Sequence, residues 1–197
     1  MKRGTITLLV VLGIVAIVVL GIVGFVQRTY NGLVQSDEQV KASWAQVQTV
    51  LQRRADLIPN LVETVRGYQI HEQEVLIRVT EARARVAGAG TIPEQIQANQ
   101  ELGSALSRLL VVVENYPNLK ANENFIRLQD ELAGTENRIA VERRRYNEDV
   151  RDYNVKVRRF PANLVASSFG FERATPFEAA PGAETAPKVD FGTKSGQ

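Results

Sequence analysis

Polar side chains recur at positions where the hydrophobic periodicity predicts residues that point into a protein core. These positions hold Asp37, Arg54, Glu72, Asn99, Thr135 and Glu142, and Thr135 is flanked by Glu136 and Arg138. Carboxylates on facing helices are ligands of di-iron bundles, which also use Glu-x-x-His pairs from two helices. A metal-dependent carboxylate site is therefore the first chemistry that these residue types suggest.

The supply of imidazole and thiol groups argues against that chemistry. The chain has one histidine, His71, and no cysteine, so neither the di-iron pattern nor a usual zinc ligand set is present. No residue stands in a recognisable nucleophile motif, and no glycine-rich phosphate loop occurs. We therefore predict no catalytic residue, no metal and no cofactor. Ion pairing or the fixing of helix register is the predicted role of Asp37, Arg54, Glu72, Glu136, Arg138 and Glu142.

A second candidate site is the polar segment after the third predicted helix. Pro117 and Asn118 favour a turn there, and Asn122 can cap the helix that follows. Loops carry binding function more often than core residues do. The segment is therefore also a candidate partner-binding loop, made of Tyr116, Pro117, Asn118, Leu119 and Lys120.

The N-terminal residues predict how the chain is held. Gly4 to Val26 contains no charged or amide side chain, and a helix of that length crosses a hydrocarbon core of about 30 Å. The run is longer than the apolar core of a signal peptide, and no small-x-small cleavage site follows it. We predict an uncleaved, single-pass transmembrane signal anchor over 1–29, with the lipid bilayer as the partner of residues 4–26.

Charge excludes one class of partner and favours an orientation. The formal net charge of +2 equals the contribution of Lys2 and Arg3, so the rest of the chain is balanced and nucleic acid is not an expected partner. Lys2, Arg3 and the terminal amine precede the span, whereas Arg28 and Lys41 follow it. The positive-inside rule favours, by a narrow margin, an extracytoplasmic location for the bulk of the chain, with a cytoplasmic location as the alternative.

Prolines at 59, 93, 117 and 161 divide the next region into segments with helical periodicity. Narrow apolar stripes and charged outer faces predict helices over about 31–53, 57–88, 93–114 and 121–160, with Phe160 last in the final stripe. Thr91 and Glu94 form a predicted capping box. The predicted fold is all-α: one N-terminal transmembrane helix, an antiparallel up-and-down four-helix bundle of long helices over 30–160, and a mostly irregular tail over 161–197.

Pro59 leaves two alternatives for the first of these helices. The apolar spacing continues through it from Leu51 to Val65, which fits a single kinked helix from the membrane to Val86. In the other interpretation Asp56 caps a new helix with Pro59 in its first turn, where a missing N–H costs nothing, whereas an interior proline costs about 3 kcal/mol. We favour the second interpretation.

The tail contains four phenylalanines, Phe169, Phe171, Phe177 and Phe191, without a helical period. That density is high for a disordered segment. We therefore expect Phe169 to Phe177 to dock on the base of the bundle or on the membrane surface.

Several longer motifs stand out along the chain: Trp44-Ala45-x-Val47, Leu51 to Val62 (LQRRADLIPNLV), Glu114 to Ala121 (ENYPNLKA), Glu136-Asn137-Arg138-Ile139 and Phe160-Pro161. Together they resemble the LemA family of bacterial membrane proteins. The resemblance spans the chain from the anchor to the tail. It implies a membrane helix followed by a helical bundle, with the large domain in the cytoplasm, and it implies no established activity.

The functional prediction combines this architecture with the missing chemistry. We predict a non-enzymatic scaffold or protein-interaction module anchored in the bacterial inner membrane, bound to further copies of itself as a homo-oligomer or to another envelope protein. Two alternatives remain open. One is an accessory or sensor subunit of a membrane protease or transporter, and the other is a metal-dependent carboxylate site within the bundle.

Overall fold

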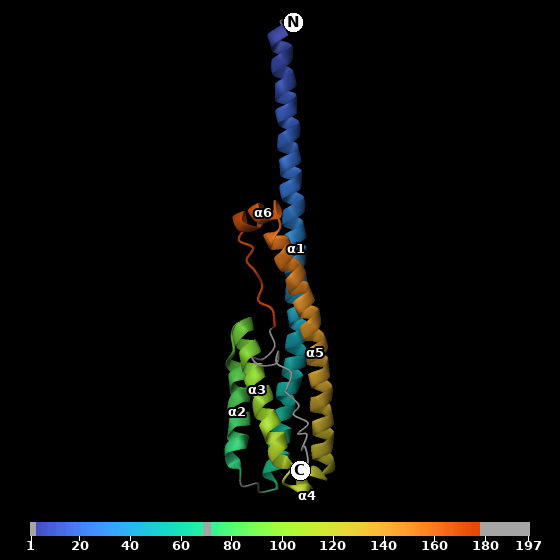
Figure 1. Cartoon of the computed structure of the whole chain (residues 1–197), viewed down its shortest axis with the longest axis vertical. Coiled ribbons are helices and arrows are strands. Elements are labelled where there is room, and N and C mark those ends of the chain that lie inside the picture. Colours follow the sequence, from blue (N-terminus) through green and yellow to red (C-terminus); the bar gives the residue numbers. More distant parts are fainter. Residues whose placement is uncertain (1–2, 69–71, 178–197) are drawn as a thin grey trace, which may run out of the picture.

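A computed structural model describes residues 3–68 and 72–177 (Figure 1). Its helices are α1 (Arg3–Arg66), α2 (Gln73–Gly88), α3 (Ile92–Val113), α4 (Pro117–Lys120), α5 (Glu123–Arg158) and α6 (Ala162–Ser168). No strand occurs in these described ranges, and the predicted all-α class is confirmed. His71 and Phe191 lie outside the described residues.

The first part of α1 projects beyond the rest of the described chain (Figure 1). Every large apolar side chain from Leu8 to Val23 is between 51% and 71% exposed. The stretch is long and apolar enough to cross a membrane. Apolar side chains exposed on all sides of a helix need lipid around them, so this helix indicates anchoring in a membrane.

The four long helices form two pairs. α1 packs along α5, and α2 packs along α3. In the distal half of the molecule, away from the apolar stretch, all four helices run side by side (Figure 1). In the proximal half, α1 and α5 continue as a pair with α6 beside them. Because successive long helices alternate in direction, the end of α5 returns to the part of α1 that follows the apolar stretch.

Two buried clusters hold these layers together. The distal cluster contains side chains from each of the helices α1, α2, α3, α4 and α5, such as Leu61, Val79, Leu102 and Phe125. The proximal cluster joins α1, α5, α6, the tail and the start of α3. Burial of apolar surface, at roughly 25 cal/mol per Å², is the main stabilising contribution. The predicted stripe of the first helix is confirmed as core, since burial extends to Leu33, Val40, Trp44, Val47 and Leu51.

Pro59 lies inside α1, so the favoured interpretation of a new helix capped by Asp56 is wrong. The predicted helix over 57–88 is two pieces: residues 57–66 complete α1, and α2 begins only at Gln73. An interior proline deprives the carbonyl four residues earlier, that of Ala55, of its helical donor. Arg83 of α2 replaces that donor, because its Nε donates to the Ala55 carbonyl oxygen at 3.1 Å.

The predicted helix starts are confirmed where a side chain caps them. Thr91 and Glu94 form the capping box of α3, and Asn122 Oδ1 accepts a hydrogen bond from the Phe125 N–H at 3.0 Å. The last long helix ends earlier than predicted, at Arg158. Phe160 therefore leaves the buried stripe and is 75% exposed. The described part of the tail is not wholly irregular, since it contains α6.

Candidate functional site

A groove of about 540 Å³ lies between α3 and α5, with α1 along its floor. It exists because α3 packs mainly on α2 and α5 packs mainly on α1, so neither pair covers the other. Its apolar wall includes Leu51, Leu106, Leu110 and Leu132. Its polar wall includes Arg54, Asn99, Ser104, Ser107, Glu136 and Arg143.

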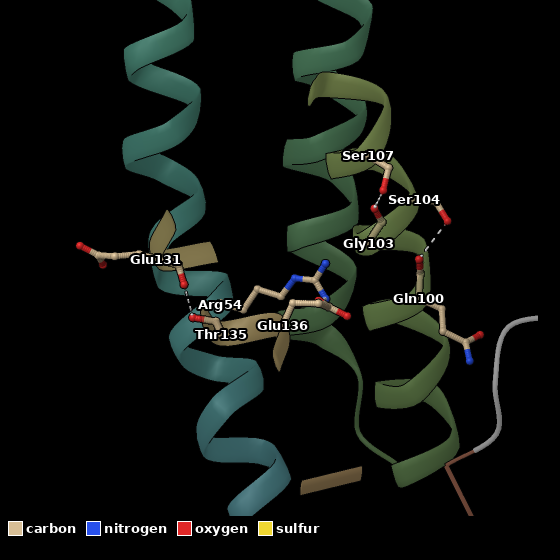
Figure 2. A network of polar contacts seen from close by, with 8 residues as sticks. All are labelled: Arg54, Gln100, Gly103, Ser104, Ser107, Glu131, Thr135 and Glu136. Carbon is tan, nitrogen blue, oxygen red and sulfur yellow. Dashed lines mark hydrogen bonds and ion pairs between the residues drawn. The ribbon is translucent and has the colours of Figure 1, made fainter. Parts of the chain in front are cut away.

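Arg54 of α1 and Glu136 of α5 form an ion pair on the groove wall, with 2.9 Å between Nη1 and Oε2 (Figure 2). The Arg54 side chain is 11% exposed, whereas the Glu136 side chain is 55% exposed. Burial lowers the pKa of the Arg54 guanidinium, and the Glu136 carboxylate opposes that change. Arginine remains protonated in proteins, so the pair places a fixed cation beside the groove.

Gly103 of α3 faces this cation (Figure 2). A Cβ atom at position 103 would lie 3.3 Å from Arg54 Nη2, which is a tight contact. Glycine in a helix interior is less favourable than alanine by about 1 kcal/mol. Here its missing side chain gives the guanidinium room between α1 and α3.

Asn99 contributes an unusual polar atom to the same groove. The residue is 5% exposed, and its Nδ2 donates to the Gln95 carbonyl oxygen at 2.8 Å. Its Oδ1 is buried and accepts no hydrogen bond. A buried acceptor without a donor costs about 1–3 kcal/mol, so a ligand that brings an N–H or O–H group to this atom would recover that free energy.

The other predicted polar residues have different surroundings. The carboxylate of Asp37 pairs with Lys41 on the same helix at 2.8 Å. Glu72 Oε2 accepts a hydrogen bond from the Tyr116 hydroxyl at 2.5 Å. Glu142 is half-buried, with Oε2 lacking a hydrogen-bond partner, and Arg138 is exposed. Of the predicted set, the structure thus joins Arg54 to Glu136 directly, and the roles proposed for the others stay predictions.

The candidate partner loop is closely tied to the helices. Its Pro117 to Lys120 form α4, Leu119 is fully buried in the distal cluster, and Lys120 pairs with Glu114. Tyr116 reaches Glu72 as described. These contacts explain much of the segment as a structural turn, and its role in binding stays a prediction.

Metal ligation finds no support in the described part of the chain. Among residues 3–68 and 72–177, no three His, Cys, Asp or Glu side chains gather closely enough to hold a metal ion. The carboxylates that the sequence placed inward therefore do not converge there.

Two asparagines of α5 hold the tail, and neither is among the predicted site residues. Asn154 Nδ2 donates to the Ala174 carbonyl oxygen, and the Ala174 N–H donates to Asn154 Oδ1, both at 2.9 Å. Asn147 makes the same two-way contact with Phe177, at 2.9 and 2.7 Å. Seven residues of helix rise about 10.5 Å, and three residues of extended chain span about 10 Å. The two spacings match. The sequence signal for this contact was therefore a Tyr-Asn pair that recurs after seven residues, at Tyr146-Asn147 and Tyr153-Asn154.

Aromatic contacts reinforce the hydrogen bonds that Asn147 and Asn154 make to the tail, here called the asparagine clamp. Tyr146 donates its hydroxyl to the Thr175 carbonyl oxygen at 2.7 Å, and burial raises the pKa of Tyr146 to about 12. Phe177 is 4% exposed, near Trp44, with the Arg143 guanidinium carbon 4.0 Å from its ring centre. The expected docking of Phe169 to Phe177 on the helices is confirmed, and Phe177 forms one end of the groove.

The fold and the site define a class: a membrane-associated helical protein whose described residues include one candidate membrane-spanning helix, near the N-terminus. Residues 43–191, more than half of the chain, match the LemA family. The protein belongs to the LemA family, as the sequence motifs predicted.

Several relatives are similar over most of their length. The magnetosome protein MamQ 2 of Paramagnetospirillum magneticum is 26% identical, over 94% of this chain and 77% of the relative. The magnetosome protein MamQ of Magnetospirillum gryphiswaldense is 25% identical over the same shares. Protein LemA of Metamycoplasma hominis is 24% identical, over 76% of this chain and 68% of the relative.

Proposed function

We propose that the protein is a non-enzymatic, membrane-anchored interaction module that binds a polypeptide segment of a partner in the groove between α3 and α5. The observation that carries the proposal is the buried, unpartnered Asn99 Oδ1 at a groove with one apolar wall. A backbone N–H of a bound segment is the donor that this atom lacks.

The lining of the groove favours a particular kind of segment. Leucine side chains from all three helices offer contact to apolar side chains. Arg54 and Arg143 bring two positive charges and Glu136 brings one negative charge, so a segment with a carboxylate is favoured over a basic one. A volume of about 540 Å³ accommodates a few side chains. The expected ligand is an apolar segment of weakly acidic character.

The continuity of α1 gives the groove its place relative to the membrane. Leu51 lies 25 residues after Val26, the last apolar residue of the N-terminal run, which is about 40 Å along a helix. The groove is thus held at a fixed height above the bilayer, as suits a scaffold. Charge favours the extracytoplasmic side of the bacterial inner membrane, and a topology reporter fused after Gln197 tests that assignment.

Site-specific photo-crosslinking of the full chain in native membranes tests the binding role. A photoreactive side chain at Ser104, which is exposed and lines the groove, should give a discrete adduct with a partner protein. The same group at Val111, which is 70% exposed on α3 outside the groove, should give none. Asn99→Leu should weaken the Ser104 adduct.

The identity of the adduct separates the alternatives. A second copy of the chain supports a self-associating scaffold, and a protease or transporter subunit supports an accessory role. Equal adducts from Ser104 and Val111 would contradict the groove as the binding surface. A Ser104 crosslink found solely within one molecule, with no adduct of higher mass, would also contradict the groove as the binding surface.

A further inference from the structure

Three large apolar side chains around α6 are exposed. The exposed fractions are 75% for Phe160, 58% for Leu164 and 56% for Phe169. On the other side of the same segment, Val165 and Ala166 are buried in the proximal cluster. The segment from Phe160 to Phe169, here called the α6 segment, is therefore amphipathic, with its outer face uncovered by the described chain. Exposed apolar patches mark surfaces that contact a protein, a ligand or a membrane.

The α6 segment lies at the level where the apolar run of α1 ends. α6 packs against both α1 and α5 (Figure 1). The Phe169 ring is 4.9 Å from the Tyr30 ring, centre to centre. Phe169 and Tyr30 also share an apolar hollow with Ile22, Val23 and Val26. Since Ile22 to Val26 are the last turn of the run that needs lipid, Phe169 sits beside residues at the edge of the hydrocarbon layer.

Charges around the α6 segment suit a phospholipid surface. Arg28 follows the apolar run, and Arg158 and Arg159 precede Phe160; all three are exposed. Between residues 158 and 173 the single acidic side chain is Glu172. Aromatic rings at the boundary together with arginines at headgroup level form the composition of interfacial membrane segments.

We propose that the α6 segment is a second membrane contact, which inserts Phe160, Leu164 and Phe169 into the interfacial layer of the leaflet beside which the helical domain lies. The occupant of this apolar face is phospholipid, because the face continues the surface of the membrane-spanning candidate itself. The contact holds the proximal helix pair against the bilayer and fixes the height and tilt of α1. It does not depend on the proposed groove, so either proposal can fail alone.

The chain contains no cysteine, so single cysteines can carry a nitroxide spin label without other changes. The full chain is reconstituted in phosphatidylcholine–phosphatidylglycerol vesicles with a label at Leu164→Cys, and at Phe160→Cys as an independent second site. Leu20→Cys, 71% exposed in the apolar run, serves as the lipid reference, and Val111→Cys serves as the water reference. Power saturation then compares collision rates with oxygen, which concentrates in lipid, and with a neutral nickel chelate, which stays in water.

The expected result is an oxygen-to-nickel collision ratio at Leu164→Cys and Phe160→Cys that is at least threefold above that at Val111→Cys and moves toward that at Leu20→Cys. A ratio equal to that at Val111→Cys would place the segment in water and overturn the proposal. Low collision rates with both reagents would show that protein, such as a second copy, covers the face, and would overturn it equally.

Discussion

Arg83 of α2 donates a hydrogen bond from Nε to the carbonyl oxygen of Ala55 in α1, at 3.1 Å. Ala55 stands four residues before Pro59, so its carbonyl is the one that the proline ring leaves without a helical donor. The contact lets α1 continue to Arg66 as one helix. It also links α2 to α1 at the position where Pro59 removes a helical hydrogen bond.

Replacing Arg83 by Met should lower the free energy of unfolding by about 1–2 kcal/mol, because the Ala55 carbonyl loses its donor. In a Pro59→Ala background residue 59 regains an N–H, and the same replacement should cost less than half as much. Thermal unfolding of the full chain in detergent, followed by circular dichroism, measures this double-mutant cycle. Arg85→Met, which breaks the surface pair with Glu101, is the control with equal cost in both backgrounds. An Arg83→Met cost that Pro59→Ala leaves unchanged would refute the assignment.

The Arg54–Glu136 pair should behave as a buried cation with a half-exposed partner. Glu136→Gln should destabilise the protein by about 1 kcal/mol, since it leaves the nearly buried Arg54 charge without its counter-charge. The double variant Arg54→Met/Glu136→Gln should be more stable than Glu136→Gln alone, because the charge is then gone. Urea unfolding of Glu136→Gln, Arg54→Met and the double variant decides the order. A double variant less stable than both single variants would show that packing of the Arg54 chain outweighs its charge.

Asn99→Leu should raise the free energy of unfolding by about 1 kcal/mol, because it removes a buried acceptor that has no donor. The same change should lower the yield of the Ser104 crosslink described above, since the groove loses its acceptor. Gains in stability with a loss of function are typical of binding sites. Asn137→Leu, on the exposed face of α5, should change neither quantity. If Asn99→Leu destabilises the domain, the unpaired atom is not a cost that binding relieves.

The asparagine clamp should protect the tail from trypsin at Arg173, which is exposed. Cleavage there requires the Ala174 backbone to leave Asn154, which binds both its N–H and its carbonyl group. Asn154→Ala removes two hydrogen bonds of about 1 kcal/mol each and should speed this cleavage tenfold or more. Mass spectrometry of the digest follows that one peptide bond, with Asn137→Ala as control. Equal rates in wild type and Asn154→Ala would argue against the clamp.

Tyr146 should make stability fall at high pH. Its pKa is raised by burial to about 12, whereas an unfolded tyrosine has a pKa of about 10. The folded state therefore holds a proton that the unfolded chain releases, and stability is full below pH 10 and lost as pH rises from about 10 to 12, by on the order of 2 kcal/mol. Tyr146→Phe should reduce that fall. Unfolding free energies between pH 8 and 12 measure the effect, and an unchanged fall in Tyr146→Phe would exclude Tyr146 as its source.

Residues of the candidate site could be predicted from sequence to the extent that burial follows helical spacing. Arg54, Asn99 and Thr135 stand on the apolar stripes, and the structure buries or nearly buries all three. Which groups they face was not predictable, because Glu136 lies on another helix and the groove results from how two helix pairs pack. Phe160 also follows the spacing, yet it is exposed because α5 ends at Arg158.

The sequence by itself determined the membrane-spanning candidate, the helical class and the caps of α3 and α5, since all three depend on neighbours within a few residues. Tertiary structure alone decided that α1 runs through Pro59, that a groove opens between α3 and α5, and that Asn147 and Asn154 bind the tail. Each of these features depends on a contact between residues far apart in the chain, such as Arg83 with Ala55 or Asn154 with Ala174. Local periodicity carries no information about such contacts, because they form only when packing brings the elements together.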